Sequence, residues 1–436
     1  MHFNTVRSVV LARLIVPRFW TDRVHQSHRA QAILASLPPK SSEPPLGLED
    51  NPHARLFQEG RLGPIIRARN DDDDDDDDEV WFFSFYTTKI GVGNPPLMFT
   101  ATVDTSWSTL FVPSANCTSG TKESQSCKIH PLYNSSLSST YQPDLSPASV
   151  RYEQWGLRTK GNVSRDSIHV GDMEIKAQTF EEAITMDEFN IFDTALGLSL
   201  FPSRSGNEPK DFMTASPFNS MVQQGLLDSN IFSLTLTRND HERGELVLGG
   251  LPSNLTGEDM IEVPLDLSKT DDSDHHYWRY YTMGGWQIPV TNMSISSYGY
   301  QDPISVLDTP QIAVISSSCS WIGLPTATVE KIHIAIGMNH TYDWIHCDKR
   351  KELSNWTIAF GPHGQRITLS PWDYLIEVYD KVYKHSKCVS AFFPLERYGD
   401  KGFIILGQPF LNGLYSVFDA DRLSISFANR RLEGWR

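Results

Sequence analysis

The sequence predicts a mainly β protein built from two related lobes. From Val80 onward, short runs of β-branched and aromatic residues alternate with Gly, Pro, Asn and Ser, a spacing typical of strands and tight turns. Helical periodicity is confined to two short segments, 216–227 and 326–337. A shift of 212 residues lays "ATVDTSWSTLFVP" (101–113) on "AVISSSCSWIGLP" (313–325). Two copies of this unit, half a chain apart, imply two β lobes that face each other.

Length and charge narrow the class of protein. A chain of 436 residues suits two domains or a bilobal one, and 39% hydrophobic residues can build a sizeable core. The net charge of -15 argues against a nucleic-acid partner, which needs a basic surface, and fits a protein that works in acid. No run of 18 apolar residues is present, so we expect no membrane span.

The composition divides the chain into a leader and a body. Residues 1–69 hold ten Lys or Arg against five Asp or Glu, and the acidic run "DDDDDDDDE" follows at 71–79. Such a run is typical of a solvated linker, and it lacks the alternating spacing and the glycine of a calcium loop. We expect residues 1–79 to be a largely disordered, pro-segment-like leader, with "RARN" (67–70) as a weak processing signal. The body then spans 80–436, with lobes at about 80–255 and 256–430.

Several features predict passage through the secretory pathway. Two disulfides, Cys117–Cys127 and Cys347–Cys388, would leave Cys319 free, although five free thiols are an alternative. The seven N-x-S/T glycosylation sequons lie at Asn116, Asn134, Asn162, Asn254, Asn292, Asn339 and Asn355. The N-terminal run "VVLARLIV" is a poor signal peptide because Arg13 interrupts it, so either the signal is weak or Met1 is not the true start. We expect a secreted or vacuolar glycoprotein that is monomeric and has no cofactor. We also expect no metal, since no C-x-x-C zinc motif is present.

Five fragments, in order along the chain, resemble the pepsin-like aspartic peptidase family from about residue 81 to 430. They are "FYTTKIGVGNPPLMF" with "FTATVDTSWSTLFVPS", "FDTALGLS", "GELVLGG", "WQIPVTNMSI" and "FIILGQPFLNGLYSVFDADRLSISFA". The resemblance implies two β lobes, short helices and a peptide-binding cleft between the lobes. It also implies aspartic endopeptidase chemistry, and the chain resembles degenerate members of that family, including fungal ones.

That chemistry needs one aspartate from each lobe. Two carboxyl groups held close share one proton, so that one activates a water while the other donates to the scissile carbonyl. In the first lobe, Asp104 takes the aspartate position and Thr105 the position whose hydroxyl braces the opposite turn. Ser106 stands where the family has glycine, which suits a crowded backbone.

The second lobe departs further from the family pattern. Ser316 occupies the aspartate position, Ser317 can still act as the brace, and Ser318 again replaces glycine. An alternative register would make Asp308 of "VLDTP" the catalyst. Its distance from Pro325 is seventeen residues, against nine in the first lobe, and Pro310 would remove a backbone donor. We therefore assign the position to Ser316.

Two further residues have competing interpretations. "VRYEQWGLRTKG" (150–161) is the candidate for the flap hairpin, with Tyr152 as its tyrosine, although Tyr152 could be an ordinary strand aromatic. Trp155 at its tip could bind a ligand or contact a lobe. Cys319 is expected to be a buried inert thiol, because no histidine is placed to activate it.

Three functions follow from these features. The first is a catalytically inactive or impaired peptidase homologue that keeps its cleft for a peptide or protein segment, and the departures at Ser106, Ser316 and Ser318 favour it. The second is an active acid endopeptidase using Asp104 with another carboxylate such as Asp308. The third is a structural secreted glycoprotein.

Overall fold

The computed structural model of the chain describes sixteen stretches and leaves the remaining residues undescribed. The described residues are 10–14, 65–67, 80–82, 86–119, 126–152, 157–187, 192–204, 213–236, 244–252, 255, 260–268, 276–296, 302–338, 344–380, 385–395 and 402–430.

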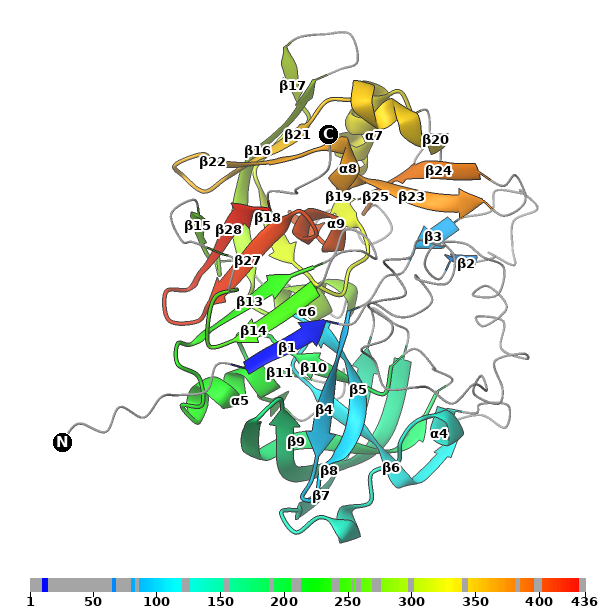
Figure 1. The fold of residues 1–436 in the computed structure, drawn as a ribbon, viewed down its shortest axis with the longest axis vertical. Helices are drawn as coiled ribbons and strands as arrows, with labels where there is room; N and C mark the ends of the chain where they lie inside the picture. Colours follow the sequence, from blue (N-terminus) through cyan, green and yellow to red (C-terminus); the bar gives the residue numbers. More distant parts are fainter. Residues whose placement is uncertain are drawn as a thin grey trace, which may run out of the picture.

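The first lobe is a seven-stranded sheet, which lies at the bottom of Figure 1. Its strands run in the order β10-β5-β4-β8-β9-β6, and β7 pairs with β8. Their bounds are β4 (Thr87–Val92), β5 (Leu97–Asp104), β6 (Leu110–Ser119), β7 (Gln142–Tyr152), β8 (Leu157–Val170), β9 (Met173–Met186) and β10 (Thr194–Gly197). Buried Phe99, Ala101 and Val103 alternate along β5, as the period of a strand requires.

The second lobe is an eight-stranded sheet, at the top of Figure 1. Its order is β22-β21-β16-β18-β26-β19-β25, and β17 pairs with β16. The bounds are β16 (Gln287–Ser296), β17 (Pro303–Ser305), β18 (Gln311–Ile315), β19 (Ile322–Leu324), β21 (Trp356–Phe360), β22 (Gln365–Leu369), β25 (Phe392–Pro394) and β26 (Phe403–Leu406). Both lobes use one arrangement, because β5 runs parallel to β10 and β18 parallel to β26. The bilobal, mainly β fold is therefore confirmed.

A six-stranded sheet joins the lobes. It has the order β1-β14-β13-β27-β28-β15, and so combines strands from both halves of the chain. The bounds are β1 (Val10–Leu14), β13 (Ile231–Thr235), β14 (Gly244–Leu248), β15 (Ile261–Pro264), β27 (Leu414–Asp419) and β28 (Ser424–Asn429). The rings of Phe232 and Phe418 stack across it with centroids 4.4 Å apart, and Trp286 packs edge-on against both. This aromatic cluster holds the two halves together.

Helices are short, and the two expected from periodicity are present. α5 (Pro217–Gln223) starts after Ser216, whose hydroxyl accepts from the Asn219 N–H, and α7 (Thr326–Ile336) ends at Gly337 in the left-handed region. The other helices are α4 (Ser126–Ile129), α6 (His276–Thr282), α8 (Pro371–Tyr374), α9 (Gln408–Leu411), and the 3-10 helices Ser135–Leu137 and Cys347–Glu352. Small sheets pair β2 (Ile65–Arg67) with β3 (Val80–Phe82), β11 (Ser203–Arg204) with β12 (Met213–Thr214), and β20 (Trp344–His346) with β24 (His385–Ser390) and β23 (Leu375–Asp380). In the described part of the chain, no helix has the length and apolarity that a membrane crossing requires.

Most of the 1–79 leader lies outside the described residues, so its expected disorder stays a prediction. Two pieces of it are described. β1 pairs antiparallel with β14, and β2 pairs with β3. Part of the run considered as a poor signal peptide is thus a strand of the sheet that joins the lobes.

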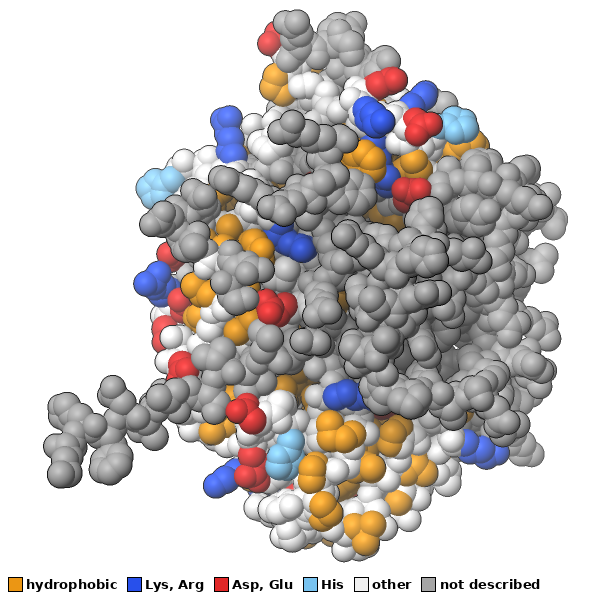
Figure 2. Space-filling view, in the orientation of Figure 1, with side chains coloured by type: hydrophobic (Ala, Val, Ile, Leu, Met, Phe, Trp, Pro, Cys, Tyr) orange, Lys and Arg blue, Asp and Glu red, His pale blue; other side chains and the backbone are white. Residues whose placement is uncertain are grey.

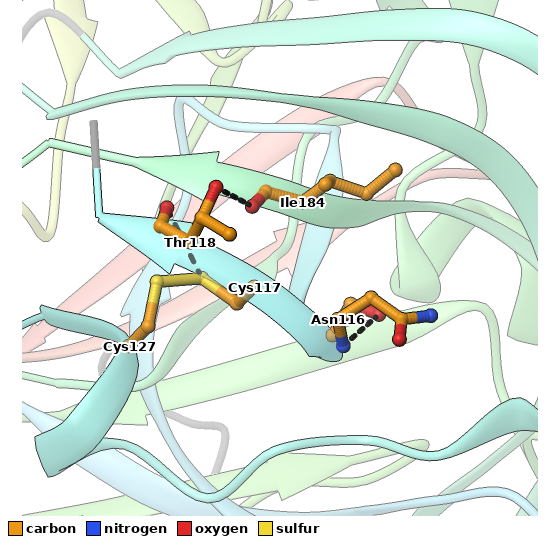
Figure 3. Close-up of a disulfide and its surroundings, with 6 residues drawn as sticks. Asn116, Cys117, Thr118, Cys127 and Ile184 are labelled. Atoms are coloured by element: carbon orange, nitrogen blue, oxygen red, sulfur yellow. Dashed lines mark hydrogen bonds between the residues drawn. A yellow bond between two sulfur atoms is a disulfide. The ribbon is translucent and has the colours of Figure 1, made fainter.

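Both predicted disulfides are present. Cys117, near the end of β6, is bonded to Cys127 on α4, and Thr118 beside it donates to the Ile184 carbonyl of β9 (Figure 3). Cys347 is bonded to Cys388 of β24. Of the sequons, Asn116, Asn134, Asn292 and Asn355 are exposed and Asn162 is half-buried, whereas Asn254 and Asn339 lie outside the described residues.

Hydrophobic side chains also reach the surface of the first lobe. Leu97 and Met98 are exposed where β5 begins. Figure 2 shows hydrophobic side chains gathered on this lobe, at the bottom of the view. Exposed apolar residues are common on protein surfaces, and they do not by themselves mark a binding site.

In each lobe, a glycine at the end of the strand that runs parallel to the motif strand lets the backbone lie close to the motif turn. A Cβ on Gly197 would lie 2.3 Å from the Trp107 carbonyl oxygen. In the second lobe, a Cβ on Gly407 would lie 2.1 Å from the Trp321 oxygen and 2.4 Å from the Cys319 oxygen. Since these neighbours are backbone atoms, the turn itself would have to move to admit any side chain.

We therefore expect Gly407→Ala to lower the free energy of unfolding by about 2 kcal/mol or more, measured by denaturant unfolding. Gly225→Ala is the matched control, because Gly225 has open space around its Cβ position and a φ of +61°. The free energy of unfolding of Gly225→Ala should fall by only about 1 kcal/mol, because alanine is strained in the left-handed backbone region. Equal losses in the two variants would contradict the close approach at Gly407.

One buried carboxyl group is poorly satisfied. Glu181 of β9 is fully buried, and its Oε2 accepts from the Thr159 hydroxyl at 2.8 Å. Its Oε1 has no hydrogen-bond partner among the described residues. Burial raises the pKa of Glu181 to about 8. The folded protein thus keeps a proton there that the unfolded chain has released.

This pKa predicts a fold that is more stable in acid. Between the ordinary value near 4.5 and about 8, the folded state binds more protons, so stability falls as the pH rises through this window. Glu181→Gln should remove much of that fall, each pKa unit being worth about 1.4 kcal/mol. Thermal melts across the window would measure it, with exposed Glu330→Gln as a charge-matched control. A fall of unchanged steepness in Glu181→Gln would refute the assignment.

Candidate active site

The two predicted motif turns meet at the junction of the lobes. Asp104 ends β5, and Ser316 follows directly after β18. Each strand is held by its parallel neighbour, because the Leu198 N–H donates to the Asp104 carbonyl and the Ser316 N–H to the Leu406 carbonyl. Because each motif strand ends in its turn at the junction of the lobes, Asp104 and Ser316 lie close together there.

Thr105 and Ser317 lock the turns together through reciprocal hydrogen bonds. The Thr105 N–H donates to Ser317 Oγ, and the Ser317 N–H donates to Thr105 Oγ1, both at 3.1 Å. Each hydroxyl then donates across the junction at 2.8 Å, Thr105 to the Ile315 carbonyl and Ser317 to the Val103 carbonyl. This symmetry repeats the 212-residue offset of the sequence, and all four groups are buried.

Asp104 is fully buried and accepts three hydrogen bonds. Its Oδ1 accepts from the Ser106 N–H at 2.8 Å, and its Oδ2 accepts from the hydroxyls of Tyr152 and Tyr280. Burial raises the pKa of Asp104, and these donors act in the opposite direction. The donor set stabilises the ionised form of a carboxylate that has been withdrawn from water.

Hydroxyl groups continue from Asp104 to the second turn. Tyr280 Oη lies 2.9 Å from Ser318 Oγ, which lies 3.1 Å from Ser316 Oγ. With the single proton of Tyr280 on Asp104, Ser318 can donate to Tyr280 and Ser316 to Ser318. The row of donors therefore ends on the Asp104 carboxylate. Ser316 is fully buried and takes part in this row, 212 residues after Asp104.

Ser106 keeps the backbone donor of the position while adding a side chain. Its hydroxyl is buried and has no partner among the described residues. A buried hydroxyl without a hydrogen bond costs free energy. The glycine-to-serine departure thus leaves the Asp104 contact in place but makes the turn less favourable.

Tyr152 lies at the end of the predicted flap strand, β7, and is fully buried. Its ring stacks on Trp107 with centroids 4.4 Å apart, and its hydroxyl reaches Asp104. The residues that follow, including Trp155, lie outside the described residues. Tyr152 therefore contacts the candidate catalytic carboxylate directly.

Tyr280 is the site residue that sequence reasoning missed. It lies on α6, in the segment "HYWRYYT" that precedes β16. This segment has no counterpart at the 212-residue offset, and its aromatic residues are as typical of a core as of a site. Only the structure shows that its hydroxyl reaches Asp104.

The alternative partner Asp308 lies in a different environment. Its side chain is 68% exposed, and its Oδ1 accepts from Lys331 Nζ at 2.5 Å. Among the described residues, no carboxylate is hydrogen-bonded to Asp104. The geometry argues against Asp308 as a partner that shares a proton with Asp104.

The Cys319 thiol adds no reactive group to the site. The Cys319 thiol is fully buried, and burial raises its pKa to about 12, so it stays protonated. Within the described ranges, no group of three or more His, Cys, Asp or Glu side chains is placed to hold a metal ion.

Comparison with known proteins assigns the family. The sequence model described as "Eukaryotic aspartyl protease" matches residues 85–430. Vacuolar protease A of Aspergillus fumigatus is 28% identical over 396 residues, covering 88% of this chain and 87% of that protein. Vacuolar protease A of Arthroderma otae is 30% identical over 353 residues, with 79% and 78% covered. Cathepsin D of Chionodraco hamatus is 30% identical over 358 residues, with 79% and 81% covered. With its two braced turns and its bilobal sheets, the chain belongs to the eukaryotic aspartyl protease family.

Proposed function

We propose that this chain is a catalytically inactive or strongly impaired member of its family that keeps the cleft as a binding site for a peptide or protein segment. The observation that carries the proposal is the composition of the junction. The Asp104 carboxyl group meets the hydroxyls of Tyr152 and Tyr280, and a row of hydroxyls continues through Ser318 to Ser316, where a peptidase needs a second carboxyl group.

The chemistry explains why hydroxyls are poor replacements. A carboxyl pair works because one member can hold a proton that the other has lost at the same pH. Burial and the nearby Asp104 charge raise the pKa of Tyr280 well above its ordinary value, so its proton is held too tightly for general acid catalysis in acid. Asp104 alone would have to be both base and acid.

The second candidate, an active acid endopeptidase, is favoured by the relatives, whose names are those of proteases. It requires another carboxylate to approach Asp104. Asp308 would have to leave Lys331 and an exposed position to do so. We therefore rank activity second.

We further propose that the protein travels the secretory route to a vacuole-like compartment as a glycoprotein. The two disulfides support an oxidising route, and relatives named as vacuolar proteases support the destination. The pairing of β1 with β14 is compatible with a leader that stays docked on the body as a pro-segment would. The greater stability in acid that Glu181 predicts fits such a compartment.

Purified full-length protein should not cleave denatured globin at acid pH, and Asp104→Ala should leave this result unchanged. The reason is that one buried aspartate cannot supply both proton transfers. A gel-based digestion assay measures it, with a cathepsin D preparation as the positive control and a thermal melt to show that both forms are folded. Cleavage by the parent chain that disappears in Asp104→Ala would overturn the proposal in favour of an active peptidase.

A further inference from the structure

Helix α6 places its own side chain at the candidate catalytic carboxylate. The Tyr280 hydroxyl donates to Oδ2 of Asp104, which belongs to the first lobe. It lies 2.9 Å from Oγ of Ser318, which belongs to the second lobe. The hydroxyl thus bridges the two turns, and Figure 1 shows α6 between the lobes. It occupies the space next to Asp104 that a ligand of the cleft would need.

Aromatic rings enclose the Tyr280 ring. Its centroid lies 5.7 Å from Trp107, 5.9 Å from Tyr152 and 4.7 Å from Tyr281. Only 7% of Tyr280 is exposed, and Asp104 is not exposed at all. The Tyr280 side chain is thus surrounded by aromatic rings, with hydrogen-bonding groups at its hydroxyl, as a bound phenol would be.

The chain after α6 is fixed against the same turns. A Cβ on Gly284 would lie 2.9 Å from the Ser106 Cα, so the backbone there touches the turn of the first lobe. The Gly284 carbonyl accepts from the Leu200 N–H, and the Trp286 indole donates to the Leu198 carbonyl, both at 2.8 Å. These contacts fix the chain that follows α6 close to the turn that carries Asp104.

We propose that Asp104, Ser318 and the surrounding aromatic rings form a phenol-binding site, which α6 fills with Tyr280 so that the cleft is closed by its own chain. This inference rests on the proposed binding function and deepens it. A peptide ligand must displace α6, and the class that the site would take is a segment presenting a tyrosine or another hydroxyl donor to Asp104. Because only the open form binds, its population lowers the apparent affinity for any such ligand.

The phenol site can be tested by cavity rescue in the full-length chain. Tyr280→Ala should be destabilised, and p-cresol should raise its melting temperature by several degrees while toluene, which lacks the hydroxyl, raises it much less. The parent chain should show no comparable response to p-cresol, because Tyr280 already fills the site. Equal responses of Tyr280→Ala to p-cresol and toluene, or none to either, would overturn the phenol site.

The closure can be tested with a statine-containing peptide, whose hydroxyl mimics the tetrahedral intermediate of peptide hydrolysis. We expect Tyr280→Ala to bind it roughly tenfold more tightly than the parent chain, by calorimetry, since a hydrogen bond to a charged group no longer has to be broken. Tyr374→Phe is the matched control, because this buried tyrosine donates to the Ser354 carbonyl instead, and its affinity should stay at the parent value.

The outcomes separate this inference from the proposed function. Equal binding by the parent chain and Tyr280→Ala would overturn closure by α6 and leave the binding function standing. Absence of binding in both would count against the binding cleft itself. If Tyr280→Ala does not fold, Tyr280→Phe serves instead. Loss of its hydrogen bond should speed amide exchange in α6, and unchanged exchange and affinity would overturn the inference.

Discussion

The reciprocal hydrogen bonds between Thr105 and Ser317 are the constraint on which the rest of the site depends. They tie together two turns that lie 212 residues apart and hold Asp104 and Ser316 at the junction of the lobes. The brace uses only hydroxyls and backbone groups, so it does not need the aspartates. This independence explains how the two turns can meet although Ser316, and not a carboxylate, follows β18.

The sequence predicted the parts of the fold that repeat. The offset that pairs Thr105 with Ser317 appears directly as hydrogen bonds, and the two helices and both disulfides lie where they were expected. Residues without a counterpart in the other lobe were not predictable. Tyr280 belongs to a segment that occurs once, and a long-range contact of a single aromatic leaves no periodic signal. The buried position of Glu181 likewise depends on how β9 pairs with β6 and β8, which the pattern of one strand does not reveal.

Asp104 and Glu181 are both fully buried, but they differ in the number of hydrogen bonds that they accept. Asp104 accepts three hydrogen bonds, which oppose the rise in its pKa that burial causes. Glu181 has one donor, the Thr159 hydroxyl, and one oxygen without a partner among the described residues. It is therefore most compatible with the fold when protonated. Burial raises the pKa of both carboxyl groups, so acid favours their protonated forms. Only Asp104 has both of its oxygens held by hydrogen bonds.

Ser316 and Tyr280 belong to one row of hydroxyl groups that reaches Asp104. In a working pair, the second carboxyl group supplies the proton that a buried aspartate requires. Without it, Asp104 would be a buried charge short of donors, which costs several kcal/mol in general. Tyr280 supplies the missing donor, and Ser318 and Ser316 orient its hydroxyl from the other lobe. An aspartate introduced at 316 alone would therefore meet Ser318 and Tyr280 before it reached Asp104. Tyr280 already donates to Asp104 Oδ2, so the helix that carries this tyrosine would have to move before a second carboxyl group could take that place.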